Sequence, residues 1–305
     1  MSTRLTEQQA RALVLGPDSV AWRYGSDLRL FLASLSALLL QVAHPTVGSG
    51  VRDHSHFEAE PWARLFRTVD WVNLTIYGGQ DAVQTGARLR EMHRRIKGIN
   101  PDGSRYHALE PGAYAWVHAT LVYTIVDAHR MFGTPLSRNE IDELYREWLG
   151  IGRLIGVREG DLPDDWDGLL AYLDDTIATR LEHTTTVDTV LRASARPARP
   201  AWLPPWTQPL WRVLRRPMAH VLLLTGIGTL PPRLRDRLGL KWTKRQEREL
   251  RLIARMSRGL TPVLPKAFRI NGPAYLRARR AAIARDEFAP DSYRLVRNGS
   301  ATAHG

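Results

Sequence analysis

Apolar residues recur at the spacing of an α-helix along almost the whole chain, and no convincing stretch alternates apolar and polar residues as a strand would. His44-Pro45 ends the longest apolar run, because the residue before a proline is pushed out of the helical region. The polar, glycine-bearing stretch after it, residues 46–60, is expected to be irregular. Helices are predicted over residues 6–15, 28–43, 61–77, 80–97, 111–131, 163–182 and 243–258, with one more opening at the capping box of Ser137 and Glu140. The pattern predicts an all-α protein.

The chain is long enough for one large domain, and 44% hydrophobic residues are enough for a sizeable core. We expect an N-terminal helix or extension over residues 1–20, a single large helical domain over 21–260, and a C-terminal helix with a flexible tail over 261–305. The absence of cysteine excludes disulfides, thiolate catalysis, iron–sulfur clusters and covalently attached haem. No Walker A loop, dinucleotide-binding glycine motif or nucleophile elbow is present, which argues against nucleotide-dependent enzymes and α/β-hydrolases.

The chain carries a net charge of +12, almost entirely through arginine. Guanidinium groups clamp carboxylates and phosphates, and a basic surface can also meet an anionic membrane or nucleic acid. Cations outnumber acids over residues 212–258, which favours a solvated face over a specific anion site. We expect no nucleic-acid partner, because no recognisable binding module accompanies the charge. The N-terminus lacks an apolar h-region and the run over 28–43 is too short to span a bilayer, so we expect a cytoplasmic protein, with peripheral membrane contact as an alternative.

One histidine, His93, stands among cations in the stretch ARLREMHRRIKG, residues 87–98. At helical spacing it shares a face with Leu89 and Ile96, while most of the cations lie on another face. An inward histidine is more often a hydrogen-bonded core residue than a ligand. A ligand would need a cavity beside the helix, which Gly86 would permit.

A second group lies on one face of the predicted helix over residues 61–77. Arg64, Arg67, Thr68 and Trp71 follow one another at i, i+3, i+4 and i+7, which indicates either an exposed arginine face or an anion site. His118 lies in a nearly all-apolar helix, where it needs a polar partner or a pocket, because an unpaired buried polar group costs about 1–3 kcal/mol.

A third group lies in the stretch after the longest apolar run. His44, His54 and His56 are close in sequence to Asp53, and imidazoles and carboxylates at these spacings could bind a divalent metal. No strict ligand motif is present. The alternative is that His44 caps the apolar helix while His54 and His56 are partly exposed loop residues.

Four stretches, taken as an ordered set, carry a resemblance to a known family: LLLQVAHPTVGSGVRDHSHF, PWARLFRTVDWVNLTIYGG, REMHRRIKG and YAWVHATLVYTIVDA. Over about residues 20–260 the chain resembles the family that includes the fungal oxygenase MpaB and latex clearing protein, a rubber oxygenase. The resemblance implies an all-helical fold that encloses one non-covalent b-type haem. It also implies an enzyme that uses dioxygen to cleave carbon–carbon double bonds in isoprenoid chains. His93 matches the family's proximal histidine, so the resemblance implies His93 as the ligand of the haem iron.

The resemblance implies further roles on the other side of the haem, where Arg64 and Thr68 match residues that function in catalysis. Latex clearing protein has a lysine before that threonine, and this chain has Arg67. Arginine stays protonated and is not expected to ligate iron, so the sixth position is open, water-filled or taken by another histidine. We expect Arg64 and Arg67 to pair with propionates or polarise bound oxygen, and Leu89 and Ile96 to line the haem slot.

Two questions stay open at this point. Relatives that cleave rubber use a glutamate as a distal base, for which Asp53, Glu58 and His54 are the candidates here. His44 and His118 match positions where many family members have histidine, and both are expected to be cofactor-binding. The expectation is a haem b-dependent oxygenase acting on a hydrophobic substrate of the isoprenoid class. The alternatives are a non-haem metal enzyme built on the histidines of residues 44–56 with Asp53, and a non-catalytic basic haem-binding or membrane-surface protein.

Overall fold

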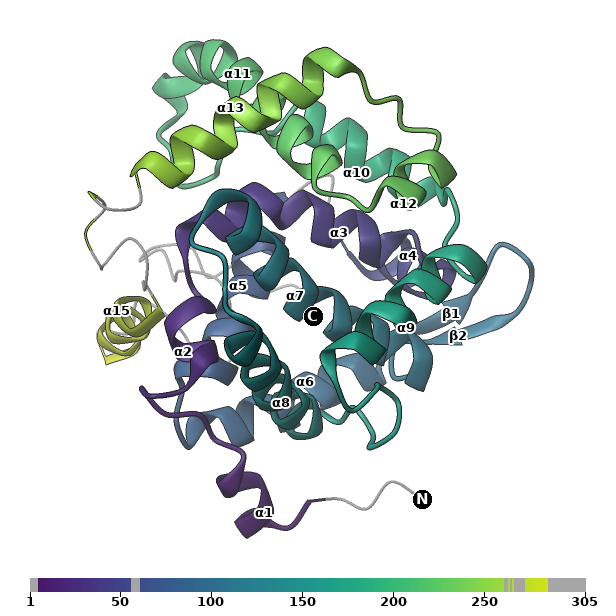
Figure 1. The fold of residues 1–305 in the computed structure, drawn as a ribbon, viewed down its shortest axis with the longest axis vertical. Helices are drawn as coiled ribbons and strands as arrows, with labels where there is room; N and C mark the ends of the chain where they lie inside the picture. Colours follow the sequence, from purple (N-terminus) through teal and green to yellow (C-terminus); the bar gives the residue numbers. More distant parts are fainter. Residues whose placement is uncertain (1–4, 56–60, 261–262, 264, 266–271, 285–305) are drawn as a thin grey trace.

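Helices form the architecture apart from one short hairpin, which confirms the all-α prediction for the described part of the chain (Figure 1). The computed structural model describes residues 5–55, 61–260, 263, 265 and 272–284. The predicted flexible tail lies beyond residue 284, outside these ranges. The first part of the chain forms α1 (Glu7–Ala12), α2 (Val20–Tyr24), the 3-10 helix η1 (Leu28–Ala33), α3 (Ser34–Val42) and α4 (Pro45–His54).

The segment after the apolar run is helical, and the expectation of an irregular stretch over residues 46–60 was wrong for residues 46–54. Pro45 occupies the first turn of α4, where its missing N–H costs nothing and its fixed φ favours a new helix. One of the two glycines that suggested a loop, Gly48, instead allows close packing. A Cβ atom on Gly48 would lie 2.7 Å from the carbonyl oxygen of Val42. His44 takes the extended backbone expected before a proline and separates α3 from α4.

The next part of the chain is a helical hairpin followed by a strand pair. It comprises α5 (Pro61–Tyr77), α6 (Asp81–Arg94), β1 (Lys97–Ile99) and β2 (Arg105–His107). The bounds of α5 are those predicted. Helix α6 ends three residues earlier than predicted, because the chain turns into β1, which pairs antiparallel with β2. The stretch between the helices predicted over 80–97 and 111–131 therefore contains a strand pair, and Gly103 supplies the positive φ of 84° in its turn.

The core is built around α7 (Pro111–Phe132), which is buried on nearly all sides and contacts η1, α3 and α8 (Arg138–Ile155). The predicted capping box opens α8. The Ser137 side chain accepts from the Glu140 backbone N–H, and the Glu140 side chain accepts from the Ser137 backbone N–H. Trp116 and Trp148 are among the largest fully buried side chains, which places the centre of the core between α7 and α8.

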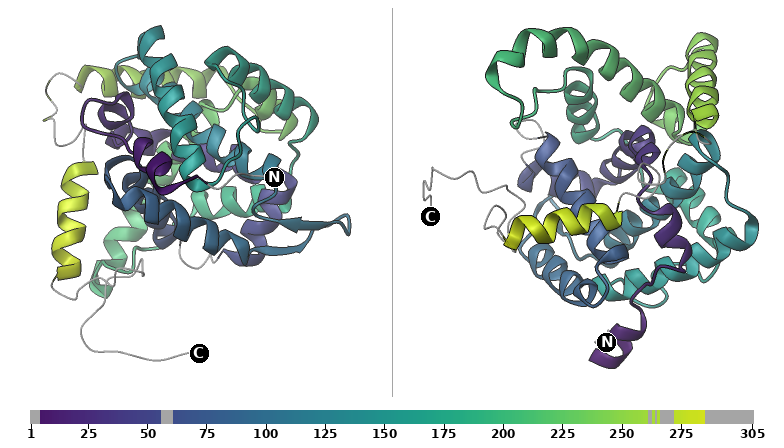
Figure 2. Two further views of the ribbon diagram at one scale, coloured as in Figure 1. Left: turned by 90° about the horizontal axis from the view of Figure 1, so that it is seen from below. Right: turned by 90° about the vertical axis from the view of Figure 1, so that its left-hand side faces the viewer.

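The remaining helices form an upper layer over α3, a flank beside α5, and α9, which packs against α8 and α12 (Figure 1). They are α9 (Trp166–Thr179), α10 (Thr185–Ala195), the 3-10 helix η2 (Pro205–Thr207), α11 (Gln208–Gly228), α12 (Pro232–Arg237), α13 (Lys244–Leu260) and α15 (Gly272–Ala284). Helix α11 packs on α3, α10 and α13, and α15 packs against α5 (Figures 1 and 2). Buried side chains from α3, α7, α8, α9 and α10 belong to one core cluster.

Membrane-spanning potential was assessed over the described residues. None of their helices has by itself the length and apolar character that a bilayer crossing requires. One pair bent by 105°, Leu28–Val42 with Pro45–His54, meets the requirement by length and composition. Leu39, Leu40 and Val42 from this pair are fully buried in the protein core.

Candidate functional site

His93 lies in the last turn of α6 with its ring turned inward. Its Nδ1 donates to the carbonyl oxygen of Leu89 at 2.8 Å, so the proton sits on Nδ1 and the lone pair on Nε2. Within the described residues, Nε2 makes no hydrogen bond. Burial lowers the pKa of His93, against a smaller opposing effect of the Leu89 hydrogen bond, so the ring is neutral near pH 7. The Tyr114 ring stands edge-on at a centroid distance of 5.5 Å.

Two expectations about the surroundings of His93 were wrong. Ile96 does not share its helix face, because α6 ends at Arg94; the Ile96 side chain lies near Gly50 of α4 instead. Gly86 does not open a cavity, because a Cβ atom there would lie 2.4 Å from the carbonyl oxygen of Leu154. Gly86 allows α6 and α8 to pack closely.

The cations around His93 have separate partners. Arg90 is half-buried and donates to the Leu154 carbonyl of α8, so it belongs to the α6–α8 contact. Arg94 pairs with Glu91 at 2.7 Å in solvent. Arg90 therefore ties α6 to α8, and Arg94 belongs to the solvent-exposed face of α6.

The α5 residues singled out in the sequence lie at the same end of the α5–α6 hairpin as His93. The two helices are antiparallel and joined by three residues, so the first turns of α5 face the last turns of α6. Burial and the neighbouring Arg67 lower the pKa of Arg64 to about 10, which leaves Arg64 protonated at neutral pH. Two like charges at a partly desolvated place favour an anion between them. The exposed Thr68 hydroxyl donates to the Arg64 carbonyl oxygen at 3.2 Å.

His118 lies one helical turn beyond Tyr114 on α7 and is 2% exposed. Its Nε2 donates to the Trp148 carbonyl oxygen at 2.8 Å, and the Trp148 indole donates back to the His118 carbonyl oxygen at 3.0 Å. The two rings stack at 5.2 Å. Burial lowers the pKa of His118 to about 4. This imidazole is therefore a neutral, satisfied part of the α7–α8 core.

His44 is also buried, between α3 and α4. Burial and the nearby Arg180 lower its pKa to about 4, so it is neutral at pH 7. Its Nδ1 is buried without a hydrogen-bond partner, which is unusual for a buried polar atom in the described structure. His44 is therefore an unsatisfied imidazole, in contrast to His118.

His54 and Asp53 lie against the β1–β2 hairpin. His54 is exposed, and its Nε2 donates to the Lys97 carbonyl oxygen at 3.1 Å. The Asp53 carboxylate accepts from Arg52 at 2.7 Å and from the Tyr106 hydroxyl at 2.7 Å, so its pKa is lowered. A candidate base in this state is already fully engaged with its neighbours. His56 and Glu58 lie outside the described residues.

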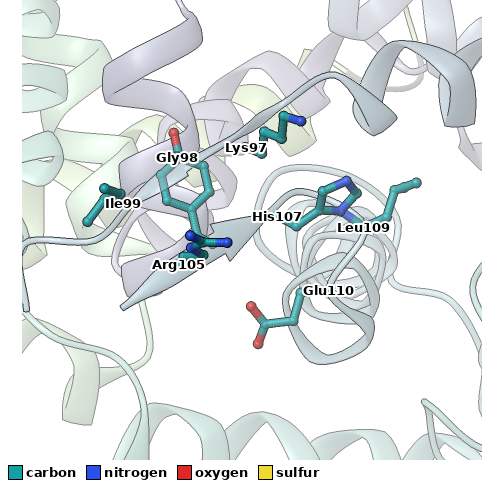
Figure 3. A pocket seen from close by; sticks show the side chains of 8 residues that line it. Lys97, Gly98, Ile99, Arg105, His107, Leu109 and Glu110 are labelled. Carbon is teal, nitrogen blue, oxygen red and sulfur yellow. The ribbon is translucent and has the colours of Figure 1, made fainter. Parts of the chain in front are cut away.

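A pocket of about 720 Å³ opens between the hairpin and the start of α7 (Figure 3). Its polar lining comes from Lys97, Arg105, His107 and Glu110. Glu110 also accepts from the Thr46 hydroxyl at 3.3 Å, which ties the pocket to α4. None of the predicted haem contacts lines this pocket.

The donor set can be tested against the two kinds of metal centre that the sequence left open. Within the described ranges no group of three or more histidine, aspartate or glutamate side chains could hold a metal ion, so these residues give the non-haem alternative no support. A haem iron needs less: one neutral imidazole with an available lone pair, and cations for the propionates. His93 and the Arg64–Arg67 pair fit that requirement.

The sequence reasoning missed Tyr114, whose ring is the aromatic neighbour of His93 and whose hydroxyl donates to the Ile155 carbonyl oxygen at 2.9 Å. Its spacing of four residues before His118 on an inward helix face was the available signal. An aromatic cluster of Trp62, Trp202 and Trp211 was also missed, because its members are far apart in sequence.

Comparisons with known proteins agree with this reading at the level of the family. The family model described as "ER-bound oxygenase mpaB/B'/Rubber oxygenase, catalytic domain" matches residues 22–259. Two relatives are 24% identical over 233 residues, which cover 75% of this chain and 87% of theirs: uncharacterized protein Mb2261 of Mycobacterium bovis and uncharacterized protein Rv2237 of Mycobacterium tuberculosis. No solved structure matches the chain at a significant level. The ordered motifs, the helical fold and the match over most of the chain show that this protein belongs to the MpaB and rubber oxygenase catalytic-domain family.

Proposed function

We propose that this protein is a haem b-dependent oxygenase that acts on a hydrophobic substrate with dioxygen, through the helical domain over residues 21–260. Isoprenoid chains are the substrate class favoured by the family resemblance. The observation that supports the proposal best is the state of His93. Its Nδ1 is fixed on the Leu89 carbonyl, and its Nε2 lone pair has no partner among the described residues. Histidines that ligate metals have this arrangement, because the hydrogen bond at one nitrogen orients the other.

The haem would supply the one-electron and dioxygen chemistry, and the protein would supply position and polarity. His93 would hold it from α6. Arg64 and Arg67 of α5 would bind its propionates or stabilise negative charge that develops during the reaction, since guanidinium groups form charge-assisted hydrogen bonds with anions. The Thr68 hydroxyl, one turn beyond Arg64, would orient substrate.

Asp53 and His54 are the described candidates for the catalytic base on the distal side of the proposed site. Asp53 is held by Arg52 and Tyr106, and a carboxylate with a lowered pKa is a weak base at neutral pH. His54 is the stronger candidate for the base, because it is exposed and bound through one nitrogen. His44 is a candidate for contact with the cofactor through its unpartnered Nδ1.

The test is a visible spectrum with a pyridine haemochrome assay on protein made with haem precursor. We expect a b-type spectrum for wild type, its loss or strong shift in His93→Gly, and its recovery when free imidazole is added to that variant. His220→Ala is the matched control, because His220 is an exposed histidine that pairs with Glu249. A colourless wild type under haem-replete conditions, or a His93→Gly spectrum equal to that of wild type, would overturn the proposal.

A further inference from the structure

An apolar corner stands at the junction of α5, η2 and α11. We define it by six side chains that all expose a large part of their surface: Phe66, Trp202, Trp206, Leu210, Val213 and Leu214. Trp206 is 78% exposed and Trp202 is 54% exposed. The spacing of the last four residues places them along one side of η2 and the first turns of α11. Exposed apolar groups that gather in this way mark an interaction surface rather than a scatter of surface residues.

The base of the apolar corner is held in place by hydrogen bonds. The Trp62 indole donates to the Ala198 carbonyl oxygen at 2.7 Å, and the Trp211 indole donates to the Pro197 carbonyl oxygen at 3.1 Å. The Trp62 ring contacts Trp202 and Trp211 edge-on at 5.9 and 6.1 Å. The segment therefore projects as a supported corner, which the right-hand view of Figure 2 shows at the start of α11. Its exposed rings are presented outward.

The charge around the apolar corner has one sign. Six arginines and no aspartate or glutamate lie between residues 189 and 217. Arg212 and Arg216 are exposed between the apolar residues of α11, and with Arg215 they form no ion pair within the described part of the chain. Helix α13 differs, because its Arg245 and Arg251 pair with Glu249 and Glu247 at 2.7 and 2.8 Å. Within the basic stretch of residues 212–258, these α11 arginines therefore lack the glutamate partners that balance Arg245 and Arg251 of α13.

We infer that the apolar corner, with the arginines of α11, docks this protein on an anionic lipid surface. Tryptophan and leucine side chains enter the boundary between headgroups and acyl chains, while guanidinium groups beside them contact anionic headgroups. An uncompensated row of arginines interleaved with apolar residues fits that boundary. The same corner of a second copy of this chain would bring no aspartate or glutamate to these arginines, because residues 189–235 contain none.

The docking brings α5 close to the lipid. Phe66 of the apolar corner lies two residues from both Arg64 and Thr68 of the candidate site, on the opposite side of the same helix. A hydrophobic substrate dissolved in the bilayer would pass around α5 to reach the site. This supply route rests on the proposed function, whereas the docking itself depends on no cofactor.

The test is co-sedimentation of the full chain with phosphatidylcholine vesicles that contain or lack phosphatidylserine. We expect binding only with phosphatidylserine, weakened by salt. Trp206→Ser with Leu210→Ser should weaken it about ten-fold or more, and Arg212→Ser with Arg216→Ser by a similar factor. The matched control is Leu252→Ser with Met256→Ser on α13, which removes side chains of similar exposure and should leave binding unchanged.

Each result separates the two proposals. Circular dichroism confirms that the variants fold, and a colourless protein that still binds vesicles would refute the haem while supporting the docking. The docking is overturned if wild type does not bind at low salt, or if the apolar-corner and α13 variants bind equally. It is also overturned if sedimentation velocity shows a wild-type dimer that the Trp206 and Leu210 substitutions dissociate, because the corner would then be an interface between two copies.

Discussion

Two inward histidines, His93 beside the Tyr114 ring and His118 one turn beyond Tyr114 on α7, show how differently the same side chain can be used. His118 is locked between α7 and α8 by reciprocal hydrogen bonds with Trp148 and by stacking on its ring. The Nδ1 of His93 donates to the Leu89 carbonyl oxygen of its own helix, and its Nε2 makes no hydrogen bond with any described residue. Burial lowers the pKa of both. Neutrality alone therefore does not identify a ligand; the partner of each nitrogen does.

The position of the two residues explains the difference. His118 faces the middle of the core, where an unpaired polar atom would be costly and a partner helix lies close. His93 lies in the last turn of α6, at the end of the α5–α6 hairpin where α5 begins, and its side chain is less buried than that of His118.

The largest stability effect is expected from His118→Ala. The substitution leaves the Trp148 carbonyl without its donor and a cavity beside the indole, so we expect the free energy of unfolding to fall by about 3 kcal/mol. Urea denaturation of the cofactor-free protein measures this. The same loss is not expected for His93→Ala, and a larger loss there would break the comparison by making His93 the more structural of the two.

A smaller loss is expected from Gly86→Ala, which lies where the His93 helix meets α8. The new methyl group would clash with the Leu154 carbonyl and push α6 outward, at a cost of about 2 kcal/mol. Because α6 carries His93, any haem spectrum should shift as well. Gln84→Ala on the exposed side of α6 is the control. An unchanged melting temperature for Gly86→Ala would contradict the close packing.

The smallest effect is the pH dependence of stability. His118 has a pKa of about 4 in the folded protein against about 6.5 unfolded, so its contribution is complete above pH 6.5 and is lost as the pH falls toward 4. This predicts a loss of about 1 kcal/mol at pH 6 from this group alone. His118→Gln, which can still donate to Trp148, should flatten that part of the profile in urea titrations. Equal slopes for wild type and variant would show that His118 is not protonated on unfolding in this range.

The sequence located most of the helices, because their signals are local. Pro61 begins α5 at the predicted residue, and Ser137 with Glu140 caps α8 as predicted. The same local signals misled at residues 45–54. There glycine and proline looked like loop formers, but Gly48 fits against the Val42 carbonyl of the preceding helix. A glycine selected for packing and one selected for a turn look alike in sequence.

The sequence by itself determined the helical class, the family and the inward face of His93, since all three depend on spacing within a few turns or on ordered motifs. Only the tertiary structure decided that His118 pairs with Trp148, that Gly86 closes a contact with α8, and that Trp62 meets Trp202. The physical reason is that these hydrogen bonds and packing contacts depend on groups tens of residues away. Trp148 lies 30 residues beyond His118 and Trp202 lies 140 beyond Trp62, and no local pattern brings either pair together.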